Sequence, residues 1–166
     1  MSEASVMIAE QDGVVAVRVL GRATFKVCRE FREYAMRVLK SSPTNAVVID
    51  LSECDTMDST FMGILAMIGL QGRGKTHLCI VGADASNQAL LSEIGVSKLW
   101  KFADGDPGSR EWTELCQAAA GSVDMTASDV GALVLDAHKT LMELDPENVP
   151  KFKNVVELLS AEMNGQ

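Results

Sequence analysis

The chain is poor in the residues that mark several specialised classes of protein. Its 166 residues include two histidines, four prolines, four cysteines and 5% aromatic side chains. No two of the cysteines form a C-x-x-C pair, so a zinc site is not expected. Spaced singly in apolar surroundings, they are predicted to be reduced core thiols; they are Cys28, Cys54, Cys79 and Cys116.

Long hydrophobic runs and an excess of basic charge are also missing. The longest nearly apolar run, residues 61–70, is too short to span a bilayer, and the first residues lack the pattern of a signal peptide. There are 15 basic against 23 acidic side chains, which give a net charge of −8 and argue against a nucleic-acid face or an anionic membrane surface. We therefore expect a soluble cytoplasmic protein made of one ordinary domain with an appendage.

The hydrophobic pattern over residues 1–103 predicts strands that alternate with helices. Residues 5–9 and 14–20 flank an Asp-Gly turn and indicate a hairpin, followed by a helix that opens at residues 21–24. A continuous β-branched strand is predicted at 46–51, a loop at 52–57 and a buried helix at 59–70. The remaining elements are a strand at 76–82, a helix at 87–94 closed by Gly95, and a strand at 96–102. The order ββαβαβαβ predicts an α/β fold with a mixed sheet.

Residues 69–76, GLQGRGKT, have the letter pattern of a phosphate-binding P-loop. A working P-loop lies after a strand and before a helix, whose N-terminal N–H groups face the phosphates. Here the predicted order is reversed, so the loop lies at a helix C-terminus, where the dipole repels phosphate. A glycine-capped turn is therefore predicted, and nucleotide hydrolysis is carried only as a third hypothesis.

The start of the buried helix is richer in polar groups than a helix end requires. Asp58, Ser59 and Thr60 stand in a row, and one short polar side chain is enough to cap a helix. The triplet therefore leaves at least one hydroxyl that is not needed for capping, although capping alone remains an explanation. A phosphate at this position would add about −1.5 to −2 charge beside Asp58, and it would act on partner recognition more than on folding.

The stretch VVIDLSECDTMDSTFMGILAMIGL (47–70) strongly resembles the centre of STAS domains, the fold of bacterial anti-sigma factor antagonists. The element order and the segment SEIGVSKLWKF (92–102) also match that family, and the resemblance covers about residues 5–103. It implies a STAS-like mixed sheet flanked by helices.

The resemblance also implies a function. An unphosphorylated antagonist binds an anti-sigma factor that is also a serine kinase; the kinase phosphorylates the serine after the motif aspartate, and a phosphatase restores it. Matched residue by residue, the motif aspartate is Asp58 and the phosphoacceptor is Ser59, with Thr60 as the alternative. The implied partner-binding residues are Asp58, Ser59, Thr60, Phe61 and Met62, and both hydroxyls are expected to face water where a partner can land.

Two departures from the family pattern leave a second function open. Phe61 stands where the family usually has glycine, and Thr24 stands where it usually has the aspartate that ends a Gly-x-x-Asp stretch. The alternative is a non-switched STAS scaffold or a subunit of a larger assembly, for example a lipid-transport complex. We place no Ser-His, paired-acid or metal arrangement, so no enzyme, cofactor or catalytic residue is predicted.

Residues 104–166 are predicted to form a helical extension. Helices are expected at 109–120, at 128–144 and after the turn at 145–148, each with one apolar stripe. The stripes either pack on the domain and on each other or form a surface for a homodimer or partner. His138, in the second of these helices, is expected to be a half-exposed histidine and not a ligand.

Overall fold

The computed structural model of the chain describes residues 4–41, 43–105, 108, 110–117 and 125–164. It begins with the predicted hairpin, in which β1 (Ser5–Gln11) pairs antiparallel with β2 (Val14–Ala23). Asp12 and Gly13 make the turn at φ 52° and 78°, in the left-handed region that an Asp-Gly hairpin turn requires.

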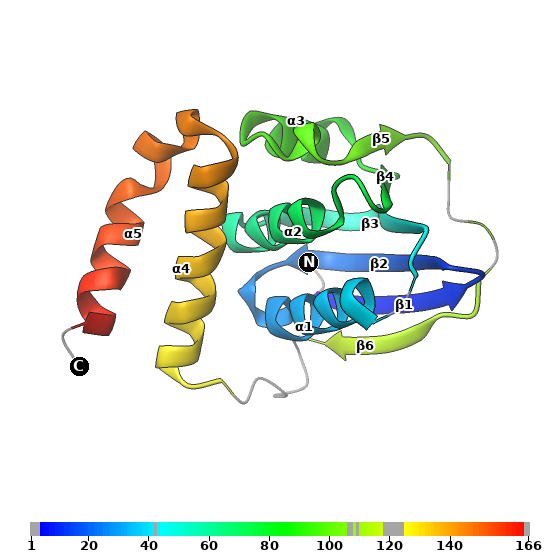
Figure 1. The fold of residues 1–166 in the computed structure, drawn as a ribbon, viewed down its shortest axis with the longest axis horizontal. Helices are drawn as coiled ribbons and strands as arrows, with labels where there is room; N and C mark the ends of the chain where they lie inside the picture. The colour runs from blue at the N-terminus through cyan, green and yellow to red at the C-terminus, as the bar shows by residue number, and fades with distance from the viewer. Residues whose placement is uncertain (1–3, 42, 106–107, 109, 118–124, 165–166) are drawn as a thin grey trace.

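Strand β2 and the three strands that follow it pair in parallel and are joined by helical crossovers. Strands β3 (Ala46–Met57), β4 (His77–Val81) and β5 (Lys101–Ala103) follow β2 in order, and the connecting helices are α1 (Phe25–Ser41), α2 (Ser59–Gly72) and α3 (Ala85–Glu93). The predicted α/β class and the order ββαβαβαβ are therefore confirmed. Helices α1 and α2 lie side by side over one face of the sheet (Figure 1).

The core lies between these two helices and the sheet. Phe31 of α1 stacks on Phe61 of α2 with ring centroids 5.4 Å apart, and both side chains are fully buried. Beneath them are the β-branched and leucine side chains of β3, among them Ile49 and Leu51. Because α2 is apolar nearly all round, it needs cover on more than the side that faces the sheet.

The largest differences from the predicted element boundaries are in three elements. Strand β2 continues to Ala23 and β3 to Met57, because these two residues pair at the ends of the strands after two register shifts. The predicted strand at 96–102 is a short 3₁₀ helix, η1 (Val96–Lys98), followed by β5. Trp100 explains the difference, since its buried ring donates from Nε1 to the carbonyl of Leu65 on α2 and holds the chain against the helix.

The P-loop pattern is a turn at the C-terminal end of α2, as predicted. Helix α2 ends at Gly72 and β4 begins at His77. The N–H groups of Lys75 and Thr76 donate to the carbonyl of Gly72, at 3.0 and 2.9 Å. These two donors are used within the turn, and the helix end beside them is the negative end of the dipole.

The extension adds a strand as well as helices. Strand β6 (Thr113–Gln117) pairs antiparallel with β1 at the edge of the sheet, so the predicted helix is wrong over these residues; Ser109 and residues 118–120 lie outside the described part. An open edge of β1 offers unpaired backbone groups, and this pairing overrides the helical spacing. The sheet order is β5-β4-β3-β2-β1-β6.

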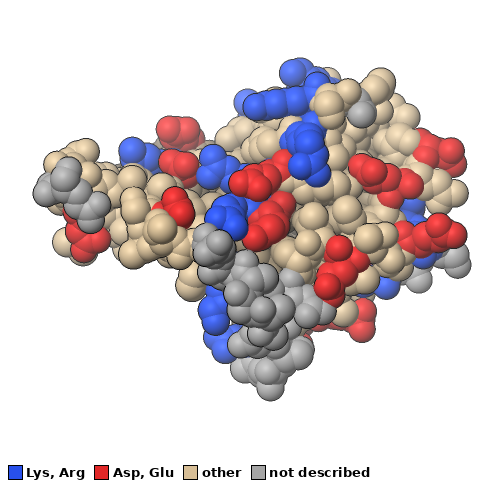
Figure 2. Space-filling model, turned by 90° about the horizontal axis from the view of Figure 1, so that it is seen from below, with Lys and Arg blue, Asp and Glu red and all other residues tan. Residues whose placement is uncertain are grey.

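The other two predicted helices of the extension are confirmed as α4 (Ala127–Leu144) and α5 (Val149–Asn164), joined by the 3₁₀ turn η2 (Pro146–Asn148). Helix α4 stands across one end of α1 and α2, and α5 lies beyond it as an outer layer (Figure 1). In the described part of the chain, no helix is long and apolar enough to cross a membrane. Seen from below, the surface carries acidic and basic side chains interspersed (Figure 2).

Candidate functional site at the N-terminus of α2

Asp58 fixes the starts of two helices at once. Its Oδ1 accepts a hydrogen bond from the Phe61 N–H of α2 at 2.8 Å, and its Oδ2 accepts one from the Phe25 N–H of α1 at 3.0 Å. Its own N–H donates to the carbonyl of Ala23 at 2.9 Å. The two helix N-termini are therefore held together by one carboxylate.

Burial sets the ionisation of this carboxyl. Removal from water raises the pKa of Asp58, and the hydrogen bonds from the Phe61 and Phe25 N–H groups oppose that rise without cancelling it. A further negative charge placed nearby would make ionisation of Asp58 still less favourable. The start of α2 is thus a place where an added phosphate has an electrostatic cost.

Replacement of Asp58 by alanine is expected to lower the free energy of unfolding by about 1–2 kcal/mol, because both helix caps are lost. Asp58→Asn should cost less, since one side-chain oxygen can still cap one helix. The matched comparison is Asp84→Ala, which removes a side chain that caps α3 alone. Urea denaturation measures all three variants, and an Asp58→Ala loss no greater than that of Asp84→Ala would contradict the shared cap.

Because Asp58 caps α2, the hydroxyl of Ser59 is free for another contact. Its Oγ lies 2.8 Å from Nε2 of His138 on α4, and Nδ1 of the same ring lies 2.6 Å from the carbonyl of Val134. A carbonyl can only accept, so Nδ1 carries the hydrogen and, in the neutral ring, Nε2 carries a lone pair. In this tautomer of the neutral ring, the Ser59 hydroxyl donates a hydrogen bond to Nε2 of His138.

Helix α4 covers this end of α2 closely. A Cβ atom placed on Gly63 would lie 2.6 Å from both Cβ and O of Ala137, so only glycine allows this approach. On the other side of α4, the His138 ring meets Phe152 of α5 edge-on, with ring centroids 4.9 Å apart. His138 is 4% exposed, so the prediction of a half-exposed histidine is wrong.

The predicted contact residues are not all at the surface. Asp58 and Ser59 are half-buried, whereas Thr60 is 4% exposed and Phe61 and Met62 are core residues. The expectation that both hydroxyls face open water is therefore wrong, because α4 lies over this end of α2. In this conformation Thr60, Phe61 and Met62 have no surface to offer a partner.

Thr24 lies one residue before the start of α1. It precedes Phe25, whose N–H donates a hydrogen bond to Asp58. Its hydroxyl accepts weakly from the Lys26 N–H at 3.4 Å, so it acts as a local turn residue. The carboxylates that the sequence places near the site, Glu53 and Asp55, are exposed on the last part of β3.

The Ser59–His138 pair does not by itself make a catalytic centre. A histidine that accepts a serine proton can activate the hydroxyl as a nucleophile. Here the base is carried by the same helix that covers the hydroxyl, so a substrate that displaced α4 would also remove the base. Among the described residues, no group of three or more histidine, cysteine, aspartate or glutamate side chains could hold a metal ion.

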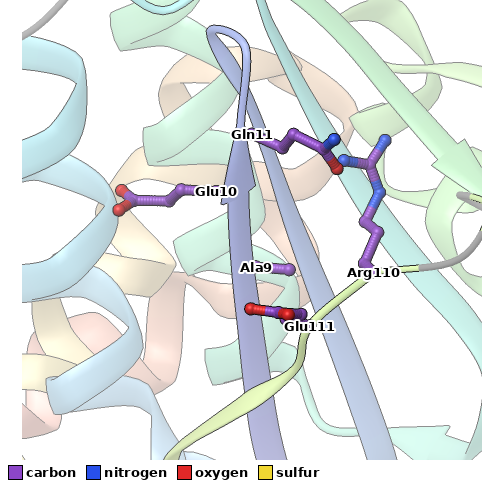
Figure 3. Close-up of a pocket in the computed structure, with 5 residues that line it drawn as sticks. All are labelled: Ala9, Glu10, Gln11, Arg110 and Glu111. Carbon is purple, nitrogen blue, oxygen red and sulfur yellow. The ribbon is translucent and has the colours of Figure 1, made fainter.

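A separate hollow lies at the opposite end of the sheet. It is lined by Ala9, Glu10, Gln11, Arg110 and Glu111. Figure 3 shows Gln11 and Arg110 reaching toward each other across it, whereas Glu10 points away. Glu10 instead accepts a hydrogen bond from the Tyr34 hydroxyl at 2.9 Å. Its described lining residues include no histidine, cysteine or serine, so they add no such nucleophile or base to the site at α2.

The fold and the start of α2 together define a class of domain: a mixed sheet whose third strand leads into a buried helix that is capped by Asp58 and begins at Ser59. The chain matches the family model described as "Mlab, STAS domain" over residues 6–101, and it belongs to that family. The predicted STAS fold is therefore confirmed. Among curated proteins, no relative matches the chain.

Two solved structures are similar to this chain, and the first shows the same fold. The anti-sigma factor antagonist SpoIIAA in its unphosphorylated form is similar with a TM-score of 0.53 and 12% identity, over 61% of this chain and 89% of that one. An uncharacterised protein with a SpoIIAA-like fold from Shewanella loihica has a TM-score of 0.44 and 12% identity, over 65% of this chain and 90% of its own. The likeness to SpoIIAA concerns the fold alone.

Proposed function

We propose that this chain is a regulatory protein-binding domain of the anti-sigma factor antagonist type, which docks a partner through the start of α2. Ser59 is the phosphoacceptor, and a serine kinase that acts as an anti-sigma factor is the partner, with a phosphatase that reverses the modification. The domain works by binding and not by catalysis.

The observation that carries this proposal is that Asp58 alone caps α2, whereas the neighbouring Ser59 takes no part in capping. Asp58 supplies the side-chain cap of α2, so the Ser59 hydroxyl is spared from holding the helix together. A phosphate on it would lie at the positive end of the helix dipole, where it is tolerated locally, and beside the Asp58 carboxylate, where it changes the surface charge. Such a position can change recognition while the fold persists.

A second function is favoured by the burial around the same serine. Thr60 is buried, Thr24 is a turn residue, and the Ser59 hydroxyl already has a partner in His138. These features support a STAS domain that is never phosphorylated and serves as a scaffold or as a subunit of a larger assembly. The family description, which names Mlab, is compatible with either function.

Association of two copies through the C-terminal helices stays a prediction. Among the described residues, the exposed large hydrophobic side chains are Val155, Leu158 and Met163, and all of them are on α5. They are the side chains that such a homodimer would bury.

The two functions are separated by phosphopeptide mass spectrometry of the protein isolated from its source cell. The switched function predicts phosphate on residue 59 in a substantial fraction of the molecules, and its loss in a Ser59→Ala strain. Phosphate absent from residues 59 and 60 under all growth conditions, together with full function of Ser59→Ala, would instead establish the non-switched domain.

A further inference from the structure

Helix α4 shows what kind of surface the start of α2 presents. It lies over Ser59 and Gly63, one turn apart on α2, and the neighbouring residues His138 and Ala137 meet them. Because Gly63 has no side chain, the small side chain of Ala137 can pack directly against it. One residue further along α4, His138 accepts a hydrogen bond from the Ser59 hydroxyl. A helix with a small residue followed by a hydrogen-bond acceptor fits both features.

We propose that the N-terminal half of α2 is a helix-binding surface, filled within the chain by α4, and that a partner docks by placing an amphipathic helix of its own there after α4 has left. This deepens the proposed function, because it specifies the partner of the same docking surface. The surface accommodates one helix at a time, so the extension and the partner compete.

Steric considerations make the covered state incompatible with a modified serine. Oγ and Nε2 are 2.8 Å apart, so a phosphorus atom cannot take the place of the hydroxyl hydrogen between them while both atoms stay where they are. Outward rotation of His138 would cost its contact with the Val134 carbonyl and its ring-edge contact with Phe152. A kinase therefore reaches Ser59 only when α4 has moved, and a phosphate keeps α4 from returning.

The far end of α4 is where the extension stays attached. The Nδ2 atom of buried Asn148 donates to the carbonyls of Ile94 and Leu141, at 2.8 and 2.7 Å, and Asp145 pairs with Lys98 at 3.0 Å. Nearer the start of α4, Asp136 reaches Arg32 of α1 at 3.3 Å, between side chains that are both partly exposed. The contacts over α2 thus lie between the Asn148 anchor and a partly exposed ion pair. Movement of α4 about that anchor would also uncover Leu133 and Ala137, which are core residues.

Alkylation of a cysteine at residue 59 tests whether α4 covers the start of α2, and it needs no partner or kinase. In the full-length Ser59→Cys protein, the rate of iodoacetamide labelling at residue 59 is measured by peptide mass spectrometry, with the urea-unfolded chain as reference. An open state of about 0.1–10% would slow labelling by at least ~10-fold. The buried Cys28 and Cys54 report any global unfolding in the same digest.

Two variants should release α4. Ala137→Glu places a charge against Gly63, and Gly63→Ala adds a methyl group that meets the α4 backbone while it improves helix propensity in α2. Each is expected to raise labelling at residue 59 by ~10-fold or more with Cys28 still protected. The matched control is Lys139→Glu, an exposed position two residues along α4, which should leave the rate unchanged.

A synthetic peptide of residues 125–145, added to the Ala137→Glu protein, should restore protection of residue 59, and the same peptide carrying Ala137→Glu should not. Fast labelling in the parent protein, or labelling that neither variant accelerates, would contradict the statement that α4 protects residue 59. Accelerated labelling that the wild-type peptide fails to slow would overturn the helix-binding surface. These outcomes are separate from the presence of phosphate on Ser59, which decides the proposed function.

Discussion

Ser59→Asp is expected to weaken partner binding by roughly 100-fold, equivalent to about 2.8 kcal/mol. The added carboxylate lies at the start of α2 next to Asp58, whose pKa is already raised by burial. A partner that docks there would bury a second negative charge without a counter-ion, and an unpaired buried charge is costly. The partner is first captured from the source cell with wild type and Ser59→Ala, identified as a serine kinase by mass spectrometry, and then titrated in purified form.

The matched control for this prediction is Ser59→Asn, which has nearly the same shape as aspartate and no charge. Both variants remove the hydroxyl that donates to His138, but the asparagine amide can still donate to Nε2 whereas the carboxylate cannot. The difference between them therefore reports the added charge, together with its effect on the contact with His138. If the aspartate and asparagine variants bind equally well, the switch has no electrostatic basis at this residue.

Arg18→Met is expected to lower the free energy of unfolding by about 3–5 kcal/mol, because it leaves a buried carboxylate without its counter-ion. Arg18 of β2 and Asp50 of β3 face each other across the parallel pair, with Nε 2.8 Å from Oδ2. The Asp50 side chain is 1% exposed and that of Arg18 is 26% exposed. Urea denaturation at neutral pH measures the loss.

The loss should diminish in acid, and its sign follows from the ionisation of Asp50. Burial alone would raise the pKa of Asp50, but hydrogen bonds from Ser52 and from Arg18 lower it below the ordinary value. The pair therefore stabilises the wild type above about pH 3.9, the ordinary aspartate pKa, and this contribution is lost as the pH falls through the lowered pKa. Without Arg18 the carboxyl protonates more easily, so the two proteins converge at low pH.

Two further variants check this interpretation. The double variant Arg18→Met/Asp50→Asn should recover most of the stability, since no charge remains buried while an oxygen can still accept from Ser52. Lys98→Met breaks a pair in which the lysine side chain is 56% exposed, so it should cost no more than about 1 kcal/mol. An equal loss for Lys98→Met and Arg18→Met would show that burial of Asp50 is unimportant.

Local signals carried most of the fold prediction. The Asp12-Gly13 turn, the β-branched run that forms β3 and the apolar helix after Asp58 are each encoded within a few residues, and each was confirmed. The wrong helix over 113–117 had a local helical spacing too. These residues instead form a strand that pairs with the open edge of β1, which lies more than a hundred residues earlier in the chain. A local window of sequence does not contain both partners of this pairing.

At the candidate site, too, the local features were predicted and the long-range contact was not. Asp58 as a helix cap and Ser59 as a residue with a spare hydroxyl follow from the residue types and their order, and the structure has both. Its cover could not be foreseen, because Ser59 and His138 are 79 residues apart and the pattern of α4 indicates only that its stripe is buried. The sole hint was Gly63, a helix-weakening residue in the middle of α2, which marks a close approach by another backbone.

By itself, then, the amino-acid sequence determined the α/β order, the capped start of α2 and the STAS family, since these depend on contacts between near neighbours and on hydrophobic period. Only the tertiary structure decided that β6 completes the sheet and that α4 lies across Ser59. Both depend on which of several apolar faces meet, and amphipathic segments of similar pattern can satisfy that requirement in many ways until the shape of the whole core selects one.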